Sequence, residues 1–278
     1  MTNLTVKPLS DHLGAEVTGV DLRHLDVSVG AALNEAFDRH SVLCLRDQQL
    51  DKSQLRDVAK LFGEPCMQVN EFQRTEGVPE VSVLSSDHVD VHGTGERVIG
   101  GTTWHTDHSF TATPPKATLL YAVEIPTSGG ETSFCNMRAA HAALDDSMRD
   151  RVDGLRAVHC YESSRSPRRM MTRTTSEREA TPDVVHPLVR RNPASGAAAL
   201  YLSTTRLECI EGMAREASDA LLDELFAHAT QSCFTYDHEW RLGDVLVWDN
   251  RCLMHHANAN YALSERRVMH RAMVNDSP

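Results

Sequence analysis

Short apolar or alternating runs, each closed by Gly, Pro, Asp or Asn, recur along the chain and constrain its fold more than any other feature. Such runs are typical of β-strands, which we expect at residues 15–20, 41–45, 81–84, 117–125, 155–161, 200–202, 244–248 and 267–274. Helical periodicity is found at residues 31–39, 55–61, 137–144 and 216–230. The pattern predicts a mainly β fold with peripheral helices, as in a β-sandwich or jelly roll.

The size and charge of the chain narrow the class of protein further. With 278 residues, 41% of them hydrophobic, we expect one domain over residues 1–278. The net charge of −11 argues against a nucleic-acid or membrane-surface partner, so local arginines must hold any anionic ligand. Seven scattered cysteines without a CxxC pair, and no signal peptide or long apolar run, predict a soluble cytoplasmic protein with reduced thiols.

The sequence WHTD at residues 104–107 places His105 and Asp107 two positions apart. In an extended strand these side chains share one face, and His255 can join them from a distant strand. Two histidines and one carboxylate that leave other metal positions open are the arrangement of non-heme Fe(II) oxygenases. A zinc hydrolase could use the same donors. His108 is expected near this site or on the surface rather than as a ligand.

Other histidines offer competing ligands. His256 directly follows His255, but in a strand the two point to opposite faces, and the WDNRxxxH spacing selects His255. His88, Asp90 and His92 also alternate, although Gly93 and Gly95 follow them and we expect a solvated segment there. The histidines without a partner at ligand spacing are expected to be structural or exposed: His159, His186, His228 and His238.

A basic segment at residues 163–183 has few apolar residues. Its arginines stand among Ser, Thr and Pro: Arg165, Arg168, Arg169, Arg173 and Arg178. A long surface loop of this kind inside a domain is usually a disordered connector or an active-site lid. Its basic character favours a lid that guards an anion.

Two further motifs carry possible anion-binding groups. Gly129 and Gly130 permit a tight turn with positive φ. Near the C-terminus, Arg267 and Arg271 share one face if their segment is a strand. If that face turns inward, the buried guanidinium groups require a carboxylate, sulfonate or phosphate partner.

Four motifs together, WHTD, SGGET, WDNRxxxH and RRVMHR, occur in the order and spacing of the taurine dioxygenase and 2,4-dichlorophenoxyacetate dioxygenase family. The chain resembles this family of Fe(II)- and 2-oxoglutarate-dependent dioxygenases from residues 13–22 to its last arginine, and it is more similar to the 2,4-dichlorophenoxyacetate branch. The resemblance implies a double-stranded β-helix, the cupin-like jelly roll. It also implies that His105, Asp107 and His255 bind Fe(II), and that O2 and 2-oxoglutarate are consumed to hydroxylate a substrate with release of succinate and CO2.

The resemblance also assigns roles to the anion-binding motifs. Thr132 and Arg267 match the positions that bind the distal carboxylate of 2-oxoglutarate, and Arg271 matches the arginine that receives an anionic substrate group. Asn70 falls near a family substrate contact. We therefore expect a small carboxylate or sulfonate substrate, such as an aryloxyalkanoate, and a homo-oligomeric protein, as a dimer or tetramer.

Two features bear on the choice of reaction. Related halogenases replace the metal-binding carboxylate with a small residue, so Asp107 favours hydroxylation over halogenation. The alternative to an enzyme is a non-catalytic jelly-roll protein that binds a metal. Only the enzyme requires a guanidinium group buried beside the metal, so the position of Arg267 separates the two hypotheses.

Overall fold

A nine-stranded sheet forms the centre of the protein. The computed structural model describes residues 4–25, 27–69, 71–90, 92–192, 195–262 and 264–275. The strands follow the order β1-β2-β3-β15-β7-β17-β6-β5, and β4 pairs with β17. Their bounds are β1 Thr5–Pro8, β2 Ala15–Thr18, β3 Val42–Leu45, β4 Glu64–Pro65, β5 Arg74–Thr75, β6 Val78–Ser85, β7 Ala117–Glu124, β15 Val245–Asp249 and β17 Val268–Asn275.

Smaller sheets complete the β structure. One has the order β14-β8-β16, with β8 at Thr132–Asn136, β14 at Thr235–His238 and β16 at Leu253–Ala257. A second has the order β10-β9-β13, and β11 pairs with β12. These strands span β9 Arg156–His159, β10 Val184–Pro187, β11 Val189–Arg191, β12 Ala198–Leu200 and β13 Leu207–Ile210.

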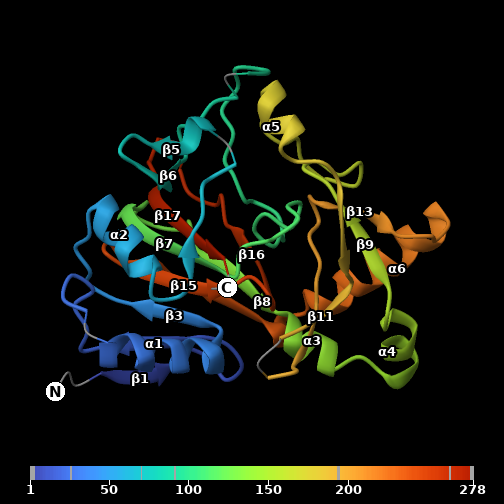
Figure 1. The fold of residues 1–278 in the computed structure, drawn as a ribbon, viewed down its shortest axis with the longest axis horizontal. Coiled ribbons are helices and arrows are strands. Elements are labelled where there is room, and N and C mark those ends of the chain that lie inside the picture. The colour runs from blue at the N-terminus through green and yellow to red at the C-terminus, as the bar shows by residue number, and fades with distance from the viewer. Residues whose placement is uncertain are drawn as a thin grey trace.

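The helices lie around the sheets (Figure 1). Helices α1 and α2 lie beside the N-terminal strands of the large sheet, whereas α4, α5 and α6 lie with β9 and β13 on the other side of the molecule. The bounds are α1 Val27–His40, α2 Lys52–Ala59, α3 Met137–Ala142, α4 Asp146–Val152, α5 Thr175–Glu179 and α6 Arg215–Ala229, with 3₁₀ turns η1 Glu71–Gln73 and η2 Ser232–Phe234.

Both faces of the large sheet are buried. In β3, Leu43 and Leu45 belong to the apolar cluster that includes α1 and α2, whereas Val42 and Cys44 belong to the cluster that includes β8, β16 and α6. This alternation follows from the two-residue period of a strand. The cluster that includes β8, β16 and α6 fills the space between the large sheet and the β14-β8-β16 sheet. The candidate site lies in the same space.

The mainly β fold with peripheral helices is confirmed. Every strand expected from the sequence overlaps an observed strand, although the one expected at 200–202 ends at Leu200, and all four expected helices are present. Residues 163–183 are not wholly irregular, because α5 forms within them. All seven cysteines have free thiols. Among the described residues, none of the helices has the length and apolar character needed to cross a membrane.

Candidate functional site

His105, Asp107 and His255 come together in space. Nε2 of His105 lies 3.8 Å from Oδ1 of Asp107, and Nε2 of His255 lies 3.6 Å from Oδ2. The candidate ligand atoms of the three side chains all lie within 4.8 Å of one another. The backbone fixes this arrangement, because His105 N donates to His255 O at 3.0 Å and His255 N donates to His105 O at 2.8 Å.

The segment that carries the first two candidate ligands is not the strand expected from the sequence. His105 forms a single β-bridge and Asp107 begins a turn. Thr106, between them, is buried, and its hydroxyl lies 3.0 Å from Leu202 O and 3.1 Å from Leu253 O. These contacts fix the position of a short irregular segment. The segment replaces the longer strand expected from the sequence.

Both imidazoles are suited to metal binding. Nδ1 of His105 lies 2.8 Å from Thr103 O, and because a carbonyl only accepts, Nδ1 carries the proton and Nε2 keeps a free lone pair. Burial lowers the pKa of His105 well below its usual value and lowers the pKa of His255 to about 4. The rings are therefore neutral at pH 7, the state in which histidine binds metals.

Asp107 is buried yet ionised. Burial by itself raises its pKa, but His255, which is charged only at low pH, and the positive charge of Arg271 outweigh burial and hold the pKa below its usual value. Thr118 Oγ1 donates to Oδ2 of Asp107 at 2.7 Å, and Asn250 Nδ2 donates to Thr118 Oγ1 at 2.9 Å. One carboxylate and two neutral imidazoles are a donor set that fits Fe(II).

A second part of the site lies around Arg267. Gly129 and Gly130 both have φ of +75°, as expected of the paired-glycine turn, and Gly130 O accepts from Nε of Arg267 at 3.0 Å. Nη2 of Arg267 lies 3.2 Å from Oγ1 of Thr132, at the start of β8. Arg267 is 9% exposed, and burial lowers its pKa to about 10. Among the described residues no carboxylate pairs with it, so the site is open to an anion.

Arg271 lies on β17 and points to the same site. Its Nη1 is 3.6 Å from Oδ1 of Asp107, and its Nη2 donates to Gln68 Oε1 at 2.8 Å. Burial lowers the pKa of Arg271. Asn70, the other residue expected to contact the substrate, lies outside the described residues.

One cavity joins these groups. The predicted residues His105, Asp107, His255, Thr132, Arg267 and Arg271 all line it. Gly100 and Gly101 also line it. His108 borders the cavity and is not part of the candidate metal group, and burial lowers its pKa to about 3.

Residues 163–183 border the same cavity through Arg168, Met170 and Met171. The segment is tied to the rest of the protein at several points. Glu208 accepts from the backbone N of Ser164 at 2.7 Å, and the carboxylate of Asp90 accepts from the backbone N of Thr172 at 2.9 Å. These hydrogen bonds connect the segment to Glu208 of β13 and to the loop that follows β6.

The rival group at residues 88–92 does not form a metal site. The clusters of ligand-type side chains found among the described residues do not include His88, Asp90 and His92 together. The expectation of a solvated segment is wrong for Asp90, which is 2% exposed and accepts hydrogen bonds from Thr172. His256 also lies apart from the triad, edge-on to Trp104 with ring centroids 4.4 Å apart.

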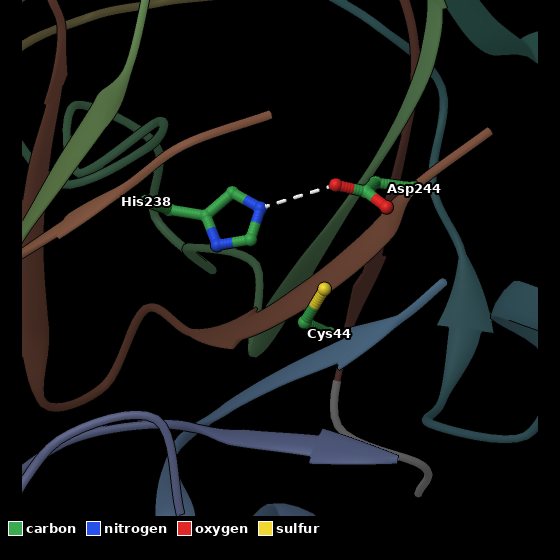
Figure 2. A group of neighbouring side chains, drawn as sticks. All are labelled: Cys44, His238 and Asp244. Atoms are coloured by element: carbon green, nitrogen blue, oxygen red, sulfur yellow. Dashed lines mark hydrogen bonds and ion pairs between the residues drawn. The ribbon is translucent and has the colours of Figure 1, made fainter. Parts of the chain in front are cut away.

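A second cluster of ligand-type residues joins Cys44, His238 and Asp244 (Figure 2). His238, expected to be a structural or exposed histidine, is buried, and its Nε2 lies 3.4 Å from Oδ2 of Asp244. That oxygen also accepts from the guanidinium of Arg46 and from the backbone N of Arg241. Because Arg46 already supplies a positive charge to Asp244, we interpret the cluster as a structural connection between β3, β14 and β15.

Comparisons with known proteins identify the family of the chain. The model of the family described as "Taurine catabolism dioxygenase TauD, TfdA family" matches residues 5–273. The chain is 34% identical to an alpha-ketoglutarate-dependent 2,4-dichlorophenoxyacetate dioxygenase of Cupriavidus pinatubonensis, over 99% of this chain and 98% of the relative. It is 33% identical to an alpha-ketoglutarate-dependent sulfate ester dioxygenase of Pseudomonas putida, over 99% and 91%. A crystal structure of AAD-2 with Mn(II) and N-oxalylglycine superposes with a TM-score of 0.83 at 31% identity, covering 99% of this chain and 98% of that one.

Proposed function

Because the chain belongs to the taurine catabolism dioxygenase TauD, TfdA family and is a 2-oxoglutarate-dependent dioxygenase, we propose that His105, Asp107 and His255 hold its Fe(II). The protein hydroxylates a small organic anion, while 2-oxoglutarate is converted to succinate and CO2. The presence of Asp107 favours hydroxylation over halogenation. The alternative of a metal-binding protein without catalysis has no support from the relatives, which are named as dioxygenases.

The buried guanidinium of Arg267 is the observation that carries the proposal. A barrel that only binds a metal has no reason to bury this charge beside the metal ligands, because an unpaired buried charge is costly. Arg267 and Thr132 offer a cation and a hydroxyl to one carboxylate, a pairing that suits the distal carboxylate of 2-oxoglutarate. Both residues line the cavity that contains the triad.

The chain's own residues bind, orient and shield the reactants. Iron and 2-oxoglutarate, when bound, supply the oxidising chemistry with O2. The neutral imidazoles and the ionised Asp107 offer donors without prior loss of a proton, and Thr118 fixes the orientation of the carboxylate. Arg271 aims the substrate by its anionic group, and Met170 and Met171 cover the cavity.

The proposed substrate class rests on the positively charged side chains of the cavity and on the relatives named above. A carboxylate, sulfonate or sulfate group can pair with the guanidinium of Arg271. The relatives named above act on a dichlorophenoxyacetate and on sulfate esters. We propose a substrate of the same kind, a small anion with an apolar body. The cavity also contains apolar side chains that fit such a body: Leu84, Val98, Ile99, Met170 and Met171.

We also propose that residues 1–278 form one domain in which residues 163–183 act as a lid. The lid is supported by its position on the cavity and by its anchors at Glu208 and Asp90. A cytoplasmic homo-oligomer, as a dimer or tetramer, completes the proposal.

Succinate formation tests the proposed function. The purified protein, Fe(II), 2-oxoglutarate and O2 are incubated with 2,4-dichlorophenoxyacetate, a short alkyl sulfate and taurine. We expect at least one of these anions to raise succinate release above the rate without substrate. Arg267→Ala should raise the KM for 2-oxoglutarate by about 100-fold, and Arg267→Lys by less, since lysine keeps the charge but not the two-pronged geometry. An Arg267→Ala protein with an unchanged KM would contradict the proposal.

A further inference from the structure

Two guanidinium groups in the cavity have no part in the function proposed above. Arg168 lies in the segment 163–183, and Arg206 lies between β12 and β13; both line the cavity together with the triad. Within the described part of the chain, neither is paired with a carboxylate. Nε of Arg168 is buried and has no hydrogen-bond partner there, and its Nη1 makes only a long contact of 3.4 Å to Ile99 O.

Arg206 is held by aromatic rings rather than by an acid. Its guanidinium lies 4.6 Å from the ring centre of Phe110 and 4.7 Å from that of Tyr161, and it donates to the backbone carbonyl of Tyr161. Burial and, to a smaller extent, the nearby charge of Arg168 lower the pKa of Arg206 to about 10, although Tyr161 and Asp107 act in the other direction. Two like charges therefore share a partly buried space in which neither forms an ion pair with a described residue, and the charges of Glu162 and Asp107 act on them only at longer range. This arrangement is unfavourable unless an anion joins them.

The other arginines of the segment 163–183 have different partners. Arg165 pairs with Asp219 and Asp223 of α6. Arg173 lies 4.2 Å above the ring of Tyr161, and Arg169 is exposed. Of the five arginines in the segment, Arg168 alone lines the cavity. Acidic partners are thus available to this segment, and Arg168 is directed away from them.

Among the described residues, no other charged group of the cavity forms an ion pair with these two cations. Arg271 faces Asp107 at 3.6 Å, so part of its charge is already balanced. Arg267 is assigned to the distal carboxylate of 2-oxoglutarate. A single anionic group bound at Arg271 would not neutralise the whole cavity, because the positive charges of Arg168 and Arg206 would remain.

We propose that the substrate is an organic dianion, with one anionic group at Arg271 and a second between Arg168 and Arg206. The class is that of a dicarboxylate, or of a carboxylate that carries a sulfonate or sulfate at its other end, joined by an apolar body. The inference rests on the proposed function, because it takes the group at Arg271 as the substrate's first anchor. Arg168 and Arg206 are then specificity-determining residues.

Calorimetric binding without turnover tests the inference. The protein is loaded with Mn(II) and N-oxalylglycine, an unreactive analogue of 2-oxoglutarate, and titrated with matched pairs. The pairs are phenoxyacetate with (4-carboxyphenoxy)acetate, and the straight-chain monocarboxylates of five to ten carbons with the α,ω-dicarboxylates of equal length. We expect at least one dianion to bind about tenfold or more tightly than its monoanion, the gain of one charge-assisted contact.

Variants identify the residues that cause this gain. In Arg168→Gln and in Arg206→Gln, the preference for the dianion should fall to about twofold while the Kd of the monoanion stays the same. Arg206→Lys should keep most of the preference. Arg169→Gln is the matched control, because it removes the same charge from the neighbouring exposed residue, and it should bind like the unaltered protein. If Arg206→Gln fails to fold, Arg168→Gln still decides the question.

Three results would overturn the inference. In the first, no dianion of either series binds more tightly than its monoanion. In the second, the preference survives in Arg168→Gln. In the third, the variants lose the monoanion and the dianion equally, which would show one anionic group bound at these arginines. Binding of N-oxalylglycine, measured first in every variant, separates this inference from the proposed function: its absence from the unaltered protein would reject the function itself.

Discussion

Asp107 is held in place by side chains that have no candidate role as ligands. Thr118, on β7, donates to its Oδ2, and Asn250 donates to Thr118. Trp248 Nε1 donates to Oδ1 of Asn250 at 3.0 Å, so the chain of hydrogen bonds continues into the core. Each member is buried, and the carboxylate therefore keeps one orientation.

Removal of the hydroxyl of Thr118 should weaken metal binding. Thr118→Val keeps the shape of the side chain but leaves Asp107 and Asn250 without this partner. We expect the Kd for Mn(II), measured by calorimetry, to rise by about 10- to 100-fold, the usual effect of losing a partner of a metal ligand. Thr118→Ser retains the hydroxyl and should bind within about threefold of the unaltered protein. Equal Kd values for the Val and Ser variants would contradict this role.

The neighbouring histidines His255 and His256 provide a matched pair. His255 faces Asp107, whereas His256 packs against Trp104 on the other face of β16. His255→Ala should raise the Kd for Mn(II) by about 100-fold or more, because a direct ligand is lost. His256→Ala should leave the Kd within about threefold. Calorimetry on both variants measures the difference, and a larger loss in His256→Ala would mean that the ligand assignment is wrong by one position.

At the scale of residues, the sequence could predict those candidate site residues that belong to recognisable motifs. It identified the six candidate residues that line one cavity, because WHTD, SGGET, WDNRxxxH and RRVMHR mark them. It missed Thr118 and Arg206, because a threonine in a strand and an arginine in a loop carry no signal until tertiary contacts place them. Asn250 stood within a quoted motif, but its partner lies 132 positions away.

At the scale of elements, the cluster of Asp244, His238 and Arg46 connects three strands. Arg46 follows β3 and also pairs with Glu16 of β2 at 3.0 Å. Asp244 is fully buried, and its Oδ1 has no hydrogen-bond partner among the described residues. The contacts of Asp244 with Arg46, His238 and Arg241 are therefore all made by its Oδ2 atom.

Asp244→Asn should destabilise the fold. The substitution leaves Arg46 partly buried with only Glu16 as a charged partner, and loss of one member of a buried ion pair costs about 3 kcal/mol. Urea unfolding measures the change in the free energy of unfolding. Glu35→Gln, which breaks an exposed pair with Arg39, is the control and should cost less than about 0.5 kcal/mol. Similar losses in the two variants would show that the Asp244 network is not structural.

The anchoring of residues 163–183 at Glu208 should depend on pH. Burial by itself raises the pKa of Glu208, but hydrogen bonds from Ser164, Arg215 and Ser163 outweigh burial and lower the pKa to about 2. Since the folded pKa lies below the usual value of 4.5, this stabilisation is complete above pH 4.5 and is lost as the pH falls toward 2. The unaltered protein should be more stable than Glu208→Gln in urea at pH 6, and this difference should shrink on acidification. A difference that grows as the pH falls would contradict the sign.

Elements with a clear hydrophobic periodicity could be predicted, and several short elements without it could not. The strands β7, β15 and β17 have five or more residues each, in apolar or alternating runs, and were expected. Helix α5 has five residues, mostly polar, and is stabilised by the capping box of Thr174 and Glu177 rather than by an apolar stripe. Strand β8 was missed because its segment TSFCN follows a turn and precedes a helix without alternation.

At the scale of the whole molecule, the site depends on pairing between distant parts of the chain. The bridge between His105 and His255 joins a loop to β16, and Arg267 and Arg271 come from the C-terminal strand segment. A jelly roll was expected from the strand pattern and the family resemblance, and the match over residues 5–273 accords with it. The order of strands in the large sheet could not be predicted, because most of its pairings are non-local and local sequence does not encode them.

An anaerobic titration tests the central claim most directly. The metal-free protein is titrated with Fe(II) and 2-oxoglutarate without O2, and the visible spectrum is recorded for the weak charge-transfer band of the chelate. We predict that the band forms in the unaltered protein, requires both additions, and is weakened in Arg267→Ala at the same 2-oxoglutarate concentration. Iron binding without a band, or a band of equal intensity and affinity in Arg267→Ala, would contradict the proposed cosubstrate site.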